Sequence, residues 1–257
     1  MPPMDDDQLR QYLEFYQDLG IKTVYRRGAA AAPAPAPEPQ VAEPRVVRPV
    51  AAKLEPPTAE LPMAAASGES LFQIQQDIGD CRRCRLCAGR HKIVFGVGNE
   101  HSPLVFVGEG PGADEDAQGI PFVGKAGQLL TQMIEGTARK EGIVLKREDV
   151  YICNVVKCRP PDNRTPEPDE MEICGQFLYR QLMAIQPKAI CVLGGTAAKA
   201  ITGYKEGVTK MRGKWFKWRD IPVMVTYHPS FLLRGYNQAA KREAWEDLKK
   251  ILHFVYD

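Results

Sequence analysis

The sequence predicts an α/β fold with three layers, α/β/α, in which a central four-stranded parallel sheet lies between helices. Four short apolar segments rich in β-branched residues are typical of buried strands: 104–107, 150–155, 189–193 and 223–226. Segments with helical spacing of apolar residues lie between or around them: 71–80, 127–139, 167–185 and 241–255. Because strands covered on both faces are apolar throughout, this alternation favours a parallel sheet.

The first 67 residues differ from the rest in composition. Within residues 1–27 we expect a short amphipathic helix, whose apolar face repeats at helical spacing: Leu9, Tyr12, Leu13 and Tyr16. Residues 28–67 are dominated by Ala, Pro and Glu, a composition typical of a disordered Pro/Ala-rich linker. A compact domain is therefore expected over residues 68–257.

The bulk properties are those of a soluble protein. The chain has 257 residues and a net charge of +2, and it contains no apolar run long enough to span a membrane. Its first residues lack the basic start and apolar core of a signal peptide, so we expect a cytoplasmic location. Seven cysteines in that compartment favour metal or cluster ligation over disulfides.

A glycine-rich turn directly follows the first predicted strand, at Gly108-Glu-Gly-Pro-Gly112. Glycine has no Cβ, so such a turn lets the backbone approach a ligand closely. Phe122 follows, and Asn154 and His228 come at the ends of other predicted strands. Since ligands bind at the carboxyl ends of parallel strands, these residues predict a pocket for a small, flat, polar ligand.

Two alternatives compete for this turn. Gly108-x-Gly110-x-x-Ala113 satisfies the dinucleotide fingerprint, but no acid lies at the expected distance, and Pro111 and the following acids suit a pyrophosphate poorly. The turn is also compatible with a purely structural role.

The cysteines suggest a metal centre. Cys81 and Cys84 form a CxxC pair, Cys87 follows at the same spacing, and Cys158 and Cys174 are separated thiols. Such a set fits either tetrahedral Zn²⁺ or a [4Fe–4S] cluster, and the spacing leaves both open. Two further cysteines lie inside predicted strands, where we expect small buried hydrophobes: Cys153 and Cys191.

Together these motifs resemble the family-4, iron–sulfur uracil-DNA glycosylases, from about Leu71 to the end of the sequence. The matching stretches are CRRC at 81–84, VGEGPG at 107–112, GIPFVGKAGQLL at 119–130, NVVKCRPPDNRTP at 154–166, E-x-x-x-C ending at 174, and HPSFLLR at 228–234. The resemblance implies a [4Fe–4S] cluster held by Cys81, Cys84, Cys158 and Cys174. Cys87 falls at a position that the family does not use as a ligand.

The resemblance also implies a DNA repair enzyme that flips out uracil, hydrolyses its N-glycosidic bond and leaves an abasic site. Phe122 would stack on the base, and Asn154 would read its edge through one acceptor and two donors. Gly108 and Glu109 would add backbone contacts. His228 would donate a hydrogen bond to the uracil anion as it forms.

Two roles fall to acidic residues. A carboxylate would stabilise the sugar cation or orient water, and Glu109 is the first choice, with Asp116 and Glu115 as alternatives. The better-known glycosylase family blocks the 5-methyl of thymine with a tyrosine, and the matching position here is Gly112. We therefore assign thymine exclusion to Glu115, the nearest bulky side chain.

Uracil-containing DNA is the expected partner, and several basic residues near the motifs are expected to contact its phosphates. They are Lys157, Arg159, Arg164, Lys214 and Arg234. The catalytic domain is expected to be monomeric, and the N-terminal helix to dock on another replication or repair protein. Two other functions remain open, a uracil-DNA binding module without turnover and a zinc-stabilised nucleic-acid interaction protein.

Overall fold

The structure is a computed structural model that describes residues 68–234 and 237–257. The helix expected within residues 1–27 and the linker expected over 28–67 lie outside the described residues. Within the described ranges, no helix combines the length and the apolar character needed to cross a membrane.

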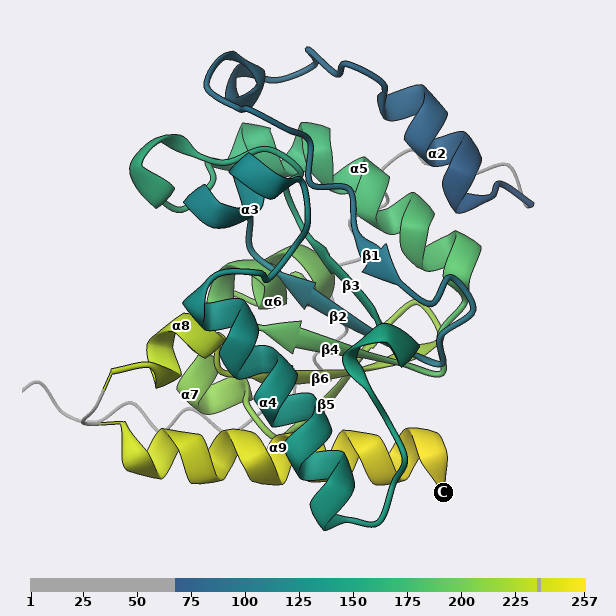
Figure 1. Cartoon of the computed structure of the whole chain (residues 1–257), viewed down its shortest axis with the longest axis vertical. Coiled ribbons are helices and arrows are strands. Elements are labelled where there is room, and N and C mark those ends of the chain that lie inside the picture. The colour runs from purple at the N-terminus through teal and green to yellow at the C-terminus, as the bar shows by residue number, and fades with distance from the viewer. Residues whose placement is uncertain (1–67, 235–236) are drawn as a thin grey trace, which may run out of the picture. The chain divides into compact units, whose positions relative to one another are not determined.

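A six-stranded sheet forms the centre, in the order β1-β3-β2-β4-β6-β5 (Figure 1). The strands are β1 (Val97–Gly98), β2 (Leu104–Gly108), β3 (Tyr151–Asn154), β4 (Ala189–Leu193), β5 (Trp215–Trp218) and β6 (Ile221–Thr226). The inner strands β3, β2, β4 and β6 run parallel and correspond to the four predicted segments. The predicted parallel sheet is therefore confirmed.

Two antiparallel edge strands extend that sheet beyond the prediction. β1 pairs with β3, and β5 pairs with β6. β1 is two residues long and ends in a glycine, so it carries no apolar pattern. β5 lies within a stretch rich in lysine and arginine, and the chain turns back into β6 at Arg219, whose φ of 53° is left-handed.

Helices cover both faces of the sheet, so the three-layer prediction is also confirmed. On one face lie α2 (Leu71–Ile78), α5 (Pro168–Ile185) and α6 (Gly195–Thr202), and on the other α4 (Lys125–Lys140) and α9 (Gln238–Tyr256). Successive residues of a strand point to opposite faces. Val105 and Val107 of β2 accordingly pack in the first layer, and Leu104 and Phe106 in the second.

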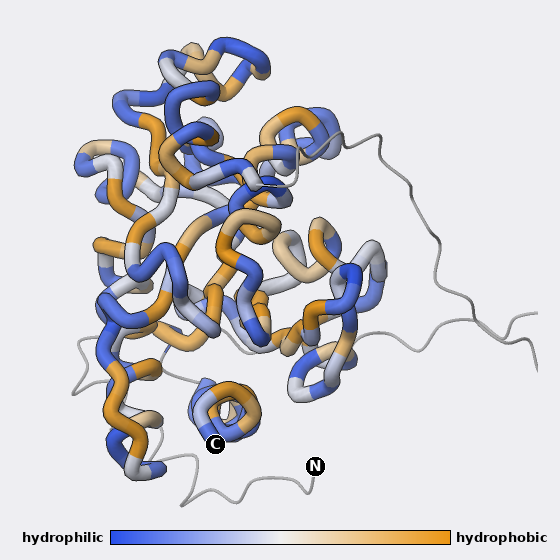
Figure 2. Tube along the Cα trace, turned by 90° about the vertical axis from the view of Figure 1, so that its right-hand side faces the viewer, coloured by the Kyte–Doolittle hydropathy of each residue, from blue (hydrophilic) through white to orange (hydrophobic). Residues whose placement is uncertain are grey.

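The helices have the apolar faces and the start signals that this layered arrangement requires. Seen along its axis, α9 is hydrophobic on one side and hydrophilic on the other (Figure 2). Ser70 and Gln73 form a capping box that starts α2, and Pro168 occupies the first turn of α5, where its missing N–H has no cost. The shorter elements are η1 (Arg85–Ala88), α3 (Ala113–Gln118), η2 (Arg147–Asp149), η3 (Pro161–Asn163), α7 (Val208–Met211) and α8 (Pro229–Leu232).

Candidate active site and cysteine cavity

A cleft of about 970 Å³ opens where the parallel strands end. Each of the four inner strands contributes to it. Its lining includes Glu109 to Gly112 after β2, Asn154 of β3, Gly194 and Gly195 after β4, and His228 and Ser230 after β6, together with Glu115, Phe122, Ala126, Pro160, Asn163 and Arg164. The topology thus brings together the three segments that the sequence placed at strand ends, and it adds a fourth, the glycine pair after β4.

Gly108 lies between the two residues expected to hold the base. A Cβ at this position would lie 2.4 Å from Asn154 Oδ1 and 2.5 Å from Phe122 Cζ. Any side chain would therefore displace the amide or the ring. The glycine is required by this close approach, which gives a physical reason for the turn seen in the sequence.

The backbone of Phe122 is held in the left-handed region, at φ 54°. A non-glycine residue adopts this conformation only where its surroundings impose it. Gly127 of α4 has no Cβ, and one there would lie 1.9 Å from the Phe122 carbonyl. From the other side, Arg147 donates to Pro121 O at 2.7 Å and to Thr131 Oγ1 at 3.0 Å. These contacts fix the ring, which is 6% exposed.

Glu115 ties the glycine turn to the loop that carries the ring. Its Oε1 accepts from the backbone N–H groups of Val123 and Gly124, both at 2.9 Å, and its Oε2 accepts from that of Gly112 at 3.1 Å. Glu115 lines the cleft, but its carboxylate is engaged by three backbone donors. Its role in thymine exclusion stays a prediction.

Asn154 carries an acceptor without a partner. The residue is 1% exposed, and within the described part of the chain its Oδ1 has no hydrogen-bond partner. An unpaired buried acceptor costs about 1–3 kcal/mol, so it is retained only for a reason. A ligand N–H entering the cleft would supply the missing donor.

His228 is fixed in one tautomer. Its Nδ1 accepts from the backbone N–H of Ser230 at 3.2 Å and lies 2.7 Å from Ser230 Oγ. Because Nδ1 accepts, the proton of the neutral ring resides on Nε2. Desolvation lowers the pKa of His228 to about 4, so the ring is neutral at pH 7. Its centroid lies 5.7 Å from that of Phe122, at an interplanar angle of 35°.

The two other acids differ in their surroundings. Glu109 lines the cleft, its carbonyl accepts from Val156 N at 3.2 Å, and within the described residues its carboxylate has no hydrogen bond or ion pair. Asp116 is 1% exposed, accepts from His91 N at 2.9 Å and pairs with His91 Nδ1 at 2.6 Å. Asp116 does not line the cleft, whereas Glu109 does, so Glu109 stays the first choice for the carboxylate that orients water or stabilises the sugar cation.

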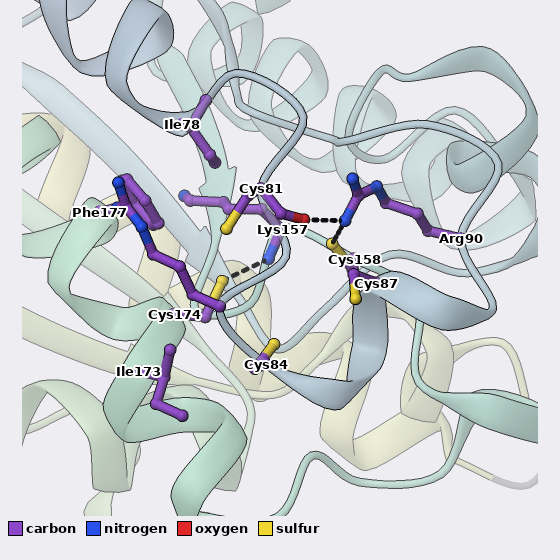
Figure 3. A pocket seen from close by; sticks show the side chains of 11 residues that line it. Ile78, Cys81, Cys84, Cys87, Arg90, Lys157, Cys158, Ile173, Cys174 and Phe177 are labelled. Carbon is purple, nitrogen blue, oxygen red and sulfur yellow. Dashed lines mark hydrogen bonds between the residues drawn. The ribbon is translucent and has the colours of Figure 1, made fainter.

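A second cavity, of about 280 Å³, is lined by five cysteines (Figure 3). Cys81, Cys84 and Cys87 come from the segment after α2, Cys158 follows β3, and Cys174 lies in α5. The CxxC pair and both separated thiols therefore meet in one place. The remaining cysteines, Cys153 and Cys191, are fully buried in β3 and β4, as expected.

Cationic side chains adjoin these sulfurs. Arg90 donates to Cys158 Sγ at 3.6 Å and also pairs with Asp80, and Lys157 lines the same cavity. Burial raises the pKa of Cys158 to about 11 and that of Cys174 to about 12, so without a bound cation both are thiols at neutral pH. No three His, Cys, Asp or Glu side chains of the described ranges converge on a single-ion position. The five thiols instead line one shared cavity.

The residues expected to contact DNA lie in different environments. Lys157 is 0% exposed, so the expected phosphate contact is wrong for this residue. The sequence shows its charge but not its burial. Arg159 is half-buried and donates to Asn163 Oδ1 at 2.8 Å. Arg164 lines the cleft and pairs with buried Glu170, and two others are exposed: Lys214 and Arg234.

Sequence reasoning missed several residues that shape the two pockets. No sequence motif marks Arg147, which holds the Phe122 loop, or Arg90, which lies beside the sulfurs. A motif does mark Gly194 and Gly195, because these glycines directly follow a predicted strand as Gly108 does.

Comparison with known proteins first gives the class of protein: residues 95–249 match the Uracil DNA glycosylase superfamily. Individual relatives then indicate one family within that superfamily. Type-4 uracil-DNA glycosylases from Thermotoga maritima, Archaeoglobus fulgidus and Sulfurisphaera tokodaii are 46%, 45% and 44% identical to this chain. The alignments cover 73%, 71% and 71% of this chain and 96%, 92% and 84% of the relatives. The chain belongs to the type-4 uracil-DNA glycosylases.

Proposed function

We propose that this protein excises uracil from DNA, releasing the free base and leaving an abasic site. The single observation that carries the proposal is the unpaired acceptor of Asn154, buried beside the ring of Phe122 in the cleft. Membership in the type-4 glycosylases supports the same activity. The enzyme would be a monofunctional hydrolase of N-glycosyl bonds.

Recognition begins when the base leaves the duplex, which costs a few kcal/mol. The flipped uracil would stack on Phe122. Asn154 Oδ1 would accept from uracil N3–H, and its Nδ2 would donate to O4. Cytosine presents the opposite pattern on this edge, so a fixed amide would leave groups unpaired against it, and such mismatches discriminate strongly.

Bond cleavage places negative charge on the departing base and positive charge on the sugar. The Nε2–H of His228 would donate to uracil O2 as that charge develops. Because the ring is neutral, this is electrostatic stabilisation and not proton transfer. The carboxylate of Glu109, without a protein partner among the described residues, would orient the attacking water or stabilise the sugar cation.

We assign the cysteine cavity to a [4Fe–4S] cluster with Cys81, Cys84, Cys158 and Cys174 as ligands, which leaves Cys87 as a spare thiol. Four thiolates around a cluster carry net negative charge, and the cations Arg90 and Lys157 suit that charge. When bound, the cluster would supply a structural tie between the start of the domain, the end of β3 and α5.

Contacts to DNA are assigned to Arg159, Arg164, Lys214 and Arg234. Beside the His228 loop, Phe231 is 38% exposed and Leu233 is 45% exposed. Exposed apolar side chains next to such a cleft suit a wedge that fills the vacated base stack. Phosphate contacts are salt-sensitive, so substituting these cations should weaken binding on all sequences alike.

The N-terminal segment is assigned to partner binding, with the catalytic domain acting as a monomer in the cytoplasm. Deleting residues 1–66 should leave excision on short oligonucleotides, iron content and melting temperature nearly unchanged. The measurement is a comparison of the deleted and full-length proteins. Loss of iron or activity on deletion would contradict the assignment.

The function is tested with an oligonucleotide containing one uracil, followed by alkali to cleave at abasic sites. We expect cleavage at the uracil with the full-length protein and none with a thymine or cytosine control. The second candidate, a binding module without turnover, rests on the same cleft. A binding module predicts a shifted band of protein bound to uracil-DNA in a native gel and no alkali-sensitive site in the DNA.

A further inference from the structure

Lys157 lies between the cysteine cavity and the cleft. Its side chain is 0% exposed and lines the cavity (Figure 3). Its Nζ donates to Asn154 O at 2.8 Å and to Gln181 Oε1 at 2.6 Å. One buried lysine thus contacts the backbone of the residue whose amide faces the cleft.

The backbone of Lys157 is tied to the cavity as well. Its N–H donates to Cys174 Sγ at 3.2 Å, and its carbonyl accepts from Val94 N at 2.8 Å. Gln181 is itself fixed, because its Nε2 donates to Phe95 O at 3.0 Å and to Tyr151 Oη at 3.1 Å. The lysine is therefore held at both ends.

The contact with Asn154 matters because β3 ends there. The Lys157 ammonium is the donor that satisfies the Asn154 carbonyl at this strand end. Without it, a buried carbonyl would lose its partner, and the peptide would be free to tilt. A tilt of that peptide moves the side-chain amide, and binding groups must be held within about 0.5 Å to remain productive.

The surroundings of Lys157 also link it to the cavity. Within the described part of the chain its Nζ contacts two oxygens and no carboxylate. Its backbone N–H contacts the sulfur of Cys174, and its side chain lines the cavity that holds the other thiols. A group bound in that cavity would therefore pack directly against this residue.

We propose that Lys157 is a positioning residue that couples the occupied cysteine cavity to the reading of uracil by Asn154. The inference rests on the proposed function and extends it. The cluster then does more than hold the chain together, because its presence sets the orientation of the base-reading amide through one side chain.

The test compares full-length Lys157→Met, which keeps the length of the side chain but removes its donors, with Lys188→Met. Lys188 is the matched control, because its Nζ also donates to a backbone carbonyl, Val255 O at 3.2 Å, and it lines neither pocket. The readouts are iron per chain, absorbance near 400 nm, and the inhibition constant of free uracil.

We expect Lys157→Met to retain iron and to bind free uracil at least about tenfold more weakly, the change expected when a buried group loses its partner. Lys188→Met should match the wild type. In the wild type, removal of iron under conditions that preserve helical circular dichroism should weaken uracil binding. In Lys157→Met the same treatment should have little further effect.

Two results would overturn the inference. One is wild-type uracil binding by iron-loaded Lys157→Met. The other is loss of iron from both Lys157→Met and Lys157→Gln, since Lys157 would then act on the cluster and not on Asn154. Failure of the proposed function is separate, because it would appear as absence of excision by the wild-type protein.

Discussion

The cleft and the cysteine cavity differ in size, lining and the state of their polar groups. The cleft, of about 970 Å³, contains a buried acceptor without a partner and a carboxylate without an ion pair among the described residues. The cavity, of about 280 Å³, gathers sulfurs and the cations that adjoin them. The first suits a ligand that enters and leaves, and the second a group that stays. Substitutions in the cleft should therefore lower turnover while the iron stays bound, whereas substitutions of the cysteines should act first on iron content and thermal stability.

The largest effect is expected from a cysteine of the cavity. Cys158→Ala should lose iron and thermal stability together, because the cluster joins three segments of the chain. Iron quantification and a melting curve provide the measurement. Cys87→Ala is the matched control and should keep a full cluster. If Cys87→Ala loses iron while Cys158→Ala keeps it, the ligand assignment is wrong.

In the cleft, His228→Ala should lower kcat by about 10²–10³, the usual effect of losing one oxyanion-type donor. Binding of uracil-DNA should change far less. The ring also caps α8, so a stability loss of about 1 kcal/mol is expected alongside. Single-turnover kinetics and a melting curve separate the two effects. Turnover within a few-fold of the wild type would remove this role from His228.

Substitutions of Glu115 separate two roles of this residue, holding the Phe122 loop and excluding thymine. Its carboxylate accepts from the backbone of the Phe122 loop, so Glu115→Ala should lower uracil excision by about tenfold through the loss of these part-buried hydrogen bonds. If Glu115 also excludes thymine by its bulk, the same variant gains activity on T·G mispairs. Glu115→Gln, of nearly equal size, is the control and should remain inactive on thymine. Thymine activity absent from both variants would place the exclusion elsewhere.

The smallest effect concerns pH. The pKa of His228 is lowered to about 4, so kcat/KM should show no His228-dependent inflection near pH 6.5. Between about pH 6.5 and 4 the unfolded chain binds a proton that the folded chain does not. The stability contributed by the neutral ring is therefore lost as pH falls through that window. Measuring kcat/KM and the free energy of unfolding against pH in the wild type and in His228→Asn isolates the contribution of His228. An inflection of kcat/KM near pH 6.5 that is present in the wild type and absent from His228→Asn would contradict the lowered pKa.

Much of the architecture follows from local patterns. The four parallel strands were predictable because each is a short apolar run, fully buried in β2, β3 and β4 and buried over the last four residues of β6. Gly108, Asn154 and His228 were predictable as pocket residues because they stand at strand ends, where a parallel sheet gathers its ligands.

The remaining features depend on tertiary contacts. The charge of Lys157 suggested a surface contact, but the residue packs under α5, where Gln181 accepts from it. The contact of Arg147 with the Phe122 loop joins residues far apart in sequence, so no local pattern marks it. β1 is an edge strand of two exposed residues, too short to show a pattern. β5 is rich in aromatic residues, but it is only partly buried and lies among lysines and arginines, so the surrounding charges hide its strand pattern.

The residues that line the cleft are distributed along the chain from Glu109 to Ser230, and most of them follow the ends of different strands of the sheet. No short segment can assemble the cleft alone. Its formation depends on contacts between distant residues, which form slowly because long loops must close first. During refolding, catalytic competence should therefore return later than helical content, and the rate of its return would report on docking of β6 beside β4.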